Sequence, residues 1–174
     1  LWVGLIKAAQ HNLKRQQSDV RLFETGLRFV PNGDELTQEP MLAGLICGSR
    51  FSMGWSNTPE KVDFYDLNVD VEAMLSTNGD TEYRFAAGEH PALHPGQCAA
   101  IFKGDKQVGL LGALHPVLQK QLGIKTPLFV FELFLNDITL GQLPQFTSVS
   151  KFPEVSRDLA FIVDESVQWA QVEE

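Results

Sequence analysis

The sequence of 174 residues predicts an α+β fold, with a largely antiparallel sheet flanked by helices. Two observations support this prediction. Amphipathic helical segments are mixed with a run of apolar, strand-like segments, and several of those strands are joined by short turn sequences. The chain lacks the strict alternation of strand and helix that is typical of a parallel sheet.

The first predicted element is an amphipathic helix in residues 1–17. Its apolar positions recur at helical spacing and would form one face: Leu1, Leu5, Ile6, Ala9 and Leu13. Residues 20–30 then alternate as in a strand. We expect the strand to be interrupted near Gly26, because glycine weakens a strand interior. We also expect its apolar side chains, including Phe23, Leu27 and Phe29, to face the core.

A hairpin follows, because residues 31–35 combine Pro, Asn-Gly and Asp before an apolar strand in residues 41–50. Residues 69–76 predict an amphipathic helix, and residues 116–123 predict another that begins at a proline and ends at a glycine. The remaining strand candidates are residues 81–87, 97–102, 107–115 and 127–135, with a tight turn at 103–105.

The chain is predicted to divide near residue 143. Residues 140–150 combine Gly, Pro and hydroxyl residues as in a linker, and residues 157–164 predict a new strand beyond it. We therefore expect one domain in residues 1–143 and a linker with part of a second domain in residues 144–174. The last residues, 169–174, look like the opening of a helix.

Composition narrows the possible functions. The formal net charge of −8 argues against a dedicated nucleic-acid domain, so any RNA contact must be local. No apolar run approaches the roughly 18 residues that cross a bilayer, so we predict no membrane partner. Cys47 and Cys98 both lie in apolar stretches and are predicted to be free thiols, which favours a reducing, cytoplasmic setting.

Motifs for catalysis are weak. Arg21, Glu24 and Arg28 are the nearest approach to a phosphate-gripping strand, but solvated arginines on a strand whose apolar side chains face the core are the more ordinary interpretation. The sequence contains no G-x-x-x-x-G-K-[ST] loop, no G-x-G-x-x-G loop and no G-x-S-x-G elbow. We therefore predict no catalytic residue and no cofactor site in this chain.

Two clusters are candidate metal ligands. His90 and His94 are four residues apart, but the prolines that follow them exclude a helix, so loop histidines are expected. A run of acids could suggest calcium, but its spacing lacks the glycine and closing glutamate of an EF-hand: Glu60, Asp63, Asp66, Asp70 and Glu72. A solvated helix face with acids near its N-terminus is the preferred interpretation, and no metal site is predicted.

Six stretches, read in order, resemble one family: 1–29 (LWVGLIKAAQHNLKRQQSDVRLFETGLRF), 62–75 (VDFYDLNVDVEAML), 90–102 (HPALHPGQCAAIF), 109–116 (GLLGALHP), 131–138 (FELFLNDI) and 150–165 (SKFPEVSRDLAFIVDE). The first five look like the catalytic-like core of the bacterial phenylalanyl-tRNA synthetase β subunit. The sixth looks like the start of that subunit's ferredoxin-fold anticodon-binding domain. The resemblance thus covers nearly the whole chain and points to a C-terminal part of the subunit.

The resemblance implies a class II aminoacyl-tRNA synthetase-like core that lacks an active site, followed by the first strand of a ferredoxin-like domain. In the family, a catalytic α subunit and the β subunit form an (αβ)₂ assembly, which uses ATP and magnesium to charge tRNA with phenylalanine. This chain would then be a scaffold for the α subunit. Lys151 and Arg157 flank the entry to the sixth stretch and are the predicted tRNA contacts; alternatively, Lys151 is merely solvated and Arg157 pairs with Asp158 or Glu154.

Two rival functions remain open at this stage. A self-sufficient adenylating enzyme would need a pair of phosphate-gripping arginines, which the late strand in residues 127–135 does not supply. An unrelated interaction domain would instead place the apolar stretch FVFELFL, residues 129–135, at an exposed sheet edge.

Overall fold

The structure is a computed structural model that describes residues 1–33, 35–51, 54–58, 60–77, 79, 83–138, 146, 148, 151–153, 155–167 and 170–173. The chain forms two compact units, Leu1–Pro144 and Gln145–Glu174. The described residues of the first unit form a sheet and four helices. In the second unit the described residues include one short helix, α5 (Ala170–Glu173), where the sequence predicted a helix to begin.

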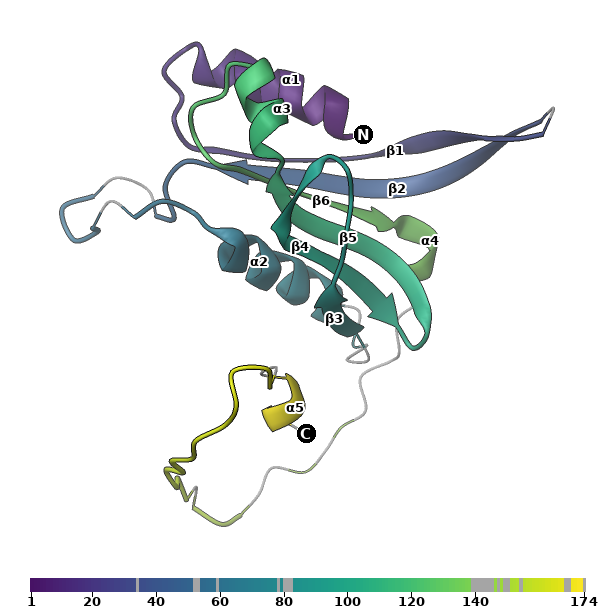
Figure 1. The fold of residues 1–174 in the computed structure, drawn as a ribbon. Helices are drawn as coiled ribbons and strands as arrows, with labels where there is room; N and C mark the ends of the chain where they lie inside the picture. The colour runs from purple at the N-terminus through teal and green to yellow at the C-terminus, as the bar shows by residue number, and fades with distance from the viewer. Residues whose placement is uncertain are drawn as a thin grey trace. The chain divides into compact units, whose positions relative to one another are not determined.

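A six-stranded antiparallel sheet forms the centre of the first unit, in the order β1-β2-β6-β5-β4-β3 (Figure 1). Its strands are β1 (Val20–Asn32), β2 (Glu35–Cys47), β3 (Tyr83–Ala87), β4 (Leu93–Lys103), β5 (Lys106–Leu114) and β6 (Leu128–Phe134). Hairpins join β1 to β2 and β4 to β5, as predicted. The predicted α+β class with an antiparallel sheet is therefore confirmed.

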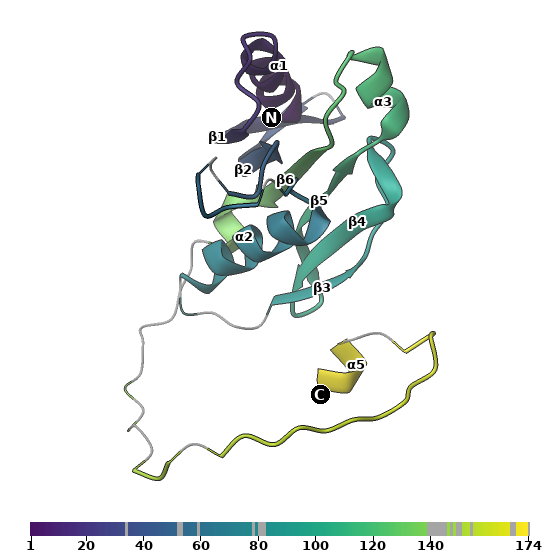
Figure 2. The ribbon, with the colours of Figure 1, turned by 90° about the vertical axis from the view of Figure 1, so that its left-hand side faces the viewer.

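Helices cover both faces of the sheet. One face packs against α1 (Trp2–Leu13) and α3 (Pro116–Gln121), and the other packs against α2 (Phe64–Ser76). Figure 2 shows α1 and α3 together at one end of this unit, apart from α2. A short helix, α4 (Leu135–Ile138), directly follows β6. We refer to the two sides of the sheet as the α1 face and the α2 face.

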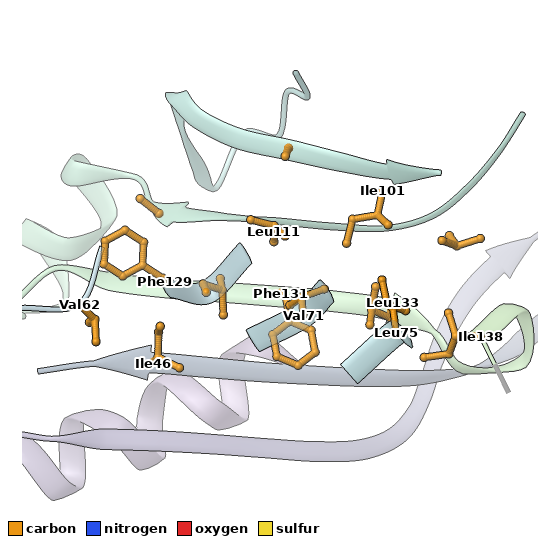
Figure 3. Packing of buried hydrophobic residues seen from close by; sticks show 14 residues of the cluster. Ile46, Val62, Val71, Leu75, Ile101, Leu111, Phe129, Phe131, Leu133 and Ile138 are labelled. Carbon is orange, nitrogen blue, oxygen red and sulfur yellow. The ribbon is translucent and has the colours of Figure 1, made fainter. Parts of the chain in front are cut away.

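The larger core lies between the α2 face and α2. Leu67, Val71 and Leu75 recur at helical spacing along α2 and are almost fully buried against β4, β5 and β6. Figure 3 shows Val71 and Leu75 in this core. Each buried aliphatic side chain of this size contributes about 1.5–3 kcal/mol of transfer free energy. Asp63 starts this helix, since its carboxylate accepts the backbone N–H groups of Tyr65 and Asp66. The helix therefore begins earlier than the predicted residues 69–76.

Strand β6 lies in the interior of the sheet, between β2 and β5. Its first four residues, Leu128 to Phe131, are all buried, because the sheet is covered on both faces. The hypothesis of an interaction domain with FVFELFL at an exposed edge is therefore wrong. A continuous apolar run in this sequence reflects burial on two sides, which an edge strand would not have.

The β1–β2 hairpin differs from the prediction in two ways. First, β1 runs without interruption through Gly26, which pairs with Met41. Second, Phe23, Leu27 and Phe29 do not face the core, and all three are exposed. The predicted alternation of side chains along β1 is confirmed, but the prediction of which face is buried is wrong. The more buried face has few large apolar residues and contains Glu24 and Arg28, so the sequence does not look like that of a buried face.

The hairpin is also longer than the strand beside it. Met41–Cys47 of β2 pair with β6, whereas residues 35–40 pair only with β1. The distal half of the hairpin is therefore a two-stranded ribbon that projects beyond the rest of the sheet (Figure 1). Such a ribbon is marginally stable by itself in water.

The predicted strand at residues 157–164 is not present in the structure, where these residues are exposed and form no strand. A strand needs a neighbouring strand to receive its backbone hydrogen bonds, and no described residue of the second unit offers one. Most of the predicted linker, residues 140–150, lies outside the described residues. Only Phe146 and Ser148 of this range are described.

Substitution of Gly44 would test how closely side chains pack against the sheet. A Cβ atom built at Gly44 would lie 2.2 Å from the ring of Phe131, which is buried. We expect Gly44→Ala to lower the free energy of unfolding by about 1–3 kcal/mol, because the ring would have to move. Urea denaturation followed by circular dichroism would measure this.

The matched control is Gly96→Ala, where the nearest atom lies 3.5 Å away at ordinary contact distance. If the two variants were equally stable, the close packing of Phe131 over β2 would be contradicted.

Candidate interaction surface

The two arginines of β1 are paired with carboxylates. Arg21 donates to Asp70 of α2 at 2.5 Å, so it connects the edge of the sheet to the helix. Arg28 lies 2.7 Å from Glu39, directly across the hairpin, and 3.6 Å from Glu132 of β6. Both guanidinium groups are thus engaged in ion pairs; Arg21 is exposed, as expected for a solvated arginine, whereas Arg28 is partly buried.

A third arginine, which sequence analysis did not single out, organises the acidic run. Arg50 follows β2, and its guanidinium lies 2.9 Å from Glu60, 3.4 Å from Asp63 and 2.7 Å from Asp66. The neighbouring carboxylates raise the pKa of Arg50, with Asp66 as the main cause. Those acids therefore form an ion-pair network at the start of α2, whereas a purely solvated face was predicted.

Asp66 has opposing influences on its charge. Burial alone would raise the pKa of its carboxyl group, but the backbone N–H of Asp63 and the guanidinium of Arg50 outweigh burial and lower it. Asp63 and Asp66 also cap α2 reciprocally, each carboxylate accepting a backbone N–H group from the other residue. This capping and the Arg50 network fix the position at which α2 begins.

The lowered pKa of Asp66 predicts a pH dependence of stability. Because the pKa is lower in the folded chain than in the unfolded chain, where it is near 3.8, the carboxylate stabilises the fold above about pH 4. That contribution is lost as the pH falls through the folded pKa. We expect Asp66→Asn to destabilise the chain at neutral pH, by an amount that shrinks as the solution is acidified.

Urea denaturation of both proteins between neutral and strongly acidic pH would measure the difference. A difference that stayed constant over this range would contradict the assigned role of the Asp66 carboxylate.

The histidines that precede prolines have local structural roles. In His90, His94 and His115 the Nδ1 atom accepts the backbone N–H two residues later, at 3.2, 3.0 and 3.2 Å. The His115 ring thereby caps α3, and His90 also packs edge-on against Trp2. His94 lies at the start of β4 rather than in a loop. Within the described residues, no group of three or more His, Cys, Asp or Glu could hold a metal ion.

Both cysteines are free, as predicted. Cys47 is buried at the end of β2, and burial raises the pKa of its thiol, opposed by a hydrogen bond with the backbone of Val20. Burial also raises the pKa of the Cys98 thiol, and the nearby charge of Glu89 adds to this effect. Raised pKa values disfavour the thiolate, which is the nucleophilic form of cysteine.

The most unusual feature is an apolar strip on the β1–β2 hairpin. It consists of Phe23, Leu27, Phe29 and Leu36, which are 78%, 47%, 56% and 64% exposed. The register places all four on one side of the hairpin. Phe23, Leu27 and Phe29 alternate along β1 from Arg21, which pairs with Ile46 on the α2 face. Leu36 pairs with Pro31, which lies on the same face of β1. Exposed apolar side chains grouped in this way mark interaction surfaces.

The two predicted tRNA contacts, Lys151 and Arg157, lie in the second unit and both are exposed. The structure forms no ion pair between Arg157 and Asp158, and Glu154 lies outside the described residues. No helix in the described part of the chain is long and apolar enough to cross a membrane.

Comparisons with known proteins agree with this architecture. Residues 1–135 match the family described as the phenylalanyl tRNA synthetase beta chain CLM domain. The chain is 54% identical over 173 residues to the phenylalanine–tRNA ligase beta subunit of Pseudomonas syringae pv. tomato, covering 99% of this chain and 22% of that subunit. The corresponding subunit of Hahella chejuensis is 48% identical over 172 residues, again covering 99% of this chain and 22% of that subunit. The chain thus spans about a fifth of the length of these relatives.

A solved structure supports the fold alone. The pyrrolysyl tRNA synthetase PylSc of Desulfitobacterium hafniense superposes with a TM-score of 0.56 at 16% sequence identity, covering 79% of this chain and 47% of that one. The antiparallel sheet of this chain is therefore similar to the sheet of an aminoacyl-tRNA synthetase.

Proposed function

The chain belongs to the family of phenylalanyl-tRNA synthetase β chains, and from this premise we propose that it is a non-catalytic scaffold within a phenylalanine–tRNA ligase. Its partner in this role is the catalytic α subunit, in an (αβ)₂ assembly in the cytoplasm. ATP and magnesium are used by the assembled enzyme in charging tRNA with phenylalanine, and this chain binds neither.

The observation that supports a scaffold role is the apolar strip on the projecting hairpin. Residues 35–40 have a strand neighbour on one side only, and Phe29 and Leu36 lie within this two-stranded region. Leaving such side chains in water forgoes about 1.5–3 kcal/mol of transfer free energy for each one. Docking the α2 face of the ribbon against another protein would recover this energy and stabilise the ribbon at the same time.

The absence of free phosphate-binding side chains on β1 supports the non-catalytic part of the proposal. Adenylate formation requires positive charge directed at a triphosphate. Arg21 and Arg28 instead neutralise Asp70, Glu39 and Glu132, so a nucleotide would have to displace existing ion pairs.

We also propose that Lys151 and Arg157 lie within reach of tRNA in the assembled ligase. Both are exposed, and the sequence of residues 150–165, in which they lie, resembles the start of a ferredoxin-fold anticodon-binding domain. In such a domain the strand predicted at residues 157–164 would form once its neighbouring strands are present.

The scaffold proposal predicts a specific loss of binding. We expect Phe29→Ser combined with Leu36→Ser to weaken association with a purified α subunit on the order of tenfold or more, because apolar contacts at the centre of an interface dominate affinity. Size-exclusion chromatography with light scattering, followed by titration calorimetry, would measure the complex and its Kd.

The matched control is Val117→Ser on α3, because Val117 is 55% exposed, as Phe29 is 56% exposed. Equal affinity of the double variant and the unaltered chain for the α subunit would contradict docking through the hairpin.

The non-catalytic proposal is tested with magnesium and ATP. We expect calorimetry to detect no binding of magnesium-ATP to the chain, whereas the α subunit binds it under the same conditions. Tight binding by this chain, abolished by Arg21→Ala, would instead favour a working nucleotide site on β1.

A further inference from the structure

The basic residues at one end of the first unit are segregated from the acids. Residues 1–18 contain Lys7, Lys14 and Arg15 and no acid, and residues 115–127 contain Lys120 and Lys125 and no acid. These two segments therefore hold five of the 14 basic residues and none of the 22 acidic ones. In a chain with a net charge of −8, such a separation creates a local positive region.

The fold brings the two segments together. The side-chain amide of Gln10 in α1 donates to the carbonyl of Leu122 after α3, at 2.6 Å. Lys14 and Lys125 line one open cavity of about 280 Å³, whose walls include the apolar side chains of Leu13 and Ile124. A neighbouring cavity of about 440 Å³ is lined by Lys120 and Lys125. We call this region the α1–α3 basic surface, and it consists of Lys7, Lys14, Arg15, Lys120 and Lys125.

The side chains of this surface are available to a ligand. All five basic residues are exposed, and the structure forms no ion pair between any of them and a described carboxylate. By contrast, Arg21, Arg28, Arg50 and Lys106 are each paired with at least one acid. Positive charge is thus neutralised at those positions and left free on the α1–α3 basic surface.

Helix dipoles explain only part of this arrangement. Lys14 and Arg15 follow the C-terminal turn of α1, and Lys120 lies in the last turn of α3, where the carbonyl groups favour cations. Lys7 lies in the middle of α1 and Lys125 lies beyond α3, so neither gains from a helix terminus. The dipoles also do not account for the lack of any acid in either segment.

We propose that the α1–α3 basic surface binds the phosphate backbone of RNA. This inference rests on the proposed function, because a tRNA ligase places tRNA near this chain, but it names a different site from Lys151 and Arg157. Closely spaced phosphates suit lysines that surround a cavity, and the binding draws on the release of counterions. Exposed lysine ammonium groups are point charges without a fixed fork, so the contact positions RNA and does not read its sequence.

The test uses the full chain and a fluorescently labelled tRNA transcript, with fluorescence anisotropy recorded over a range of salt concentrations. The test variant is Lys14→Gln with Lys125→Gln. The control is Lys61→Gln with Arg84→Gln, which removes the same charge from exposed positions outside both proposed RNA contacts. Thermal unfolding checks that both variants are folded, as expected for exposed side chains.

We expect the test variant to bind tRNA on the order of tenfold more weakly at low ionic strength, with a salt slope about 0.9 smaller for each lost phosphate contact. The control variant keeps more of the affinity than the test variant. Unchanged binding by the test variant, equal losses in both variants, or no measurable binding by the unaltered chain would each overturn the proposal. Competition by polyglutamate as effective as competition by polyuridylate would also overturn it, because the surface would then favour acidic protein.

Association with the α subunit is measured on the same variants, so that the two proposals can fail separately. If the test variant binds tRNA as well as the unaltered chain does and the chain still associates with the α subunit, only the proposal for the α1–α3 basic surface is rejected. Absence of association in every variant rejects the scaffold role, while the tRNA result still decides the role of the lysines.

Discussion

The burial of β6 on both faces is the constraint on which the rest of the first unit depends. The apolar side chains of β6 can be buried only if strands flank β6 on both sides and helices cover both faces of the sheet. Strands β2 and β5 satisfy the first condition, and α1 and α2 satisfy the second. Because α1 packs on the proximal half of the β1–β2 hairpin and α2 packs on β5 and β6, the distal half of the hairpin is left outside this cover with Phe29 and Leu36 in solvent.

Ion pairs then determine where α2 lies. Arg21 reaches the middle of the helix from the edge strand, while Arg50 gathers three carboxylates at its start. These pairs are partly exposed, so their individual contributions to stability are small, and the geometry that they fix matters more. The same pairs neutralise positive charge that a nucleotide would otherwise meet, which supports the proposed non-catalytic role.

The sequence was sufficient for the fold class, because periodicity and turn signals depend on neighbouring residues. The helix at residues 116–123, for example, was evident from Pro116 and Gly123 alone. Local sequence patterns were insufficient for features that depend on residues far apart in the chain. Arg50 lies at least ten residues from each of its carboxylates, so its role could not be read locally. The alternation in β1 showed two faces but could not show that Phe23 and Phe29 lie on the exposed one, since that depends on which strands α2 covers.

The two proposed surfaces lie on opposite faces of one sheet. The apolar strip shares its face with Ile46, on the side of α2, whereas the basic surface belongs to α1 and α3 on the other side. A protein docked on the hairpin would therefore leave the lysines accessible, and RNA bound at the lysines would leave the hairpin free. Their chemistry is separated in the same way, because apolar burial tolerates high salt while phosphate contacts weaken with it. A single sheet can thus hold a protein partner and guide a polyanion without competition between the two.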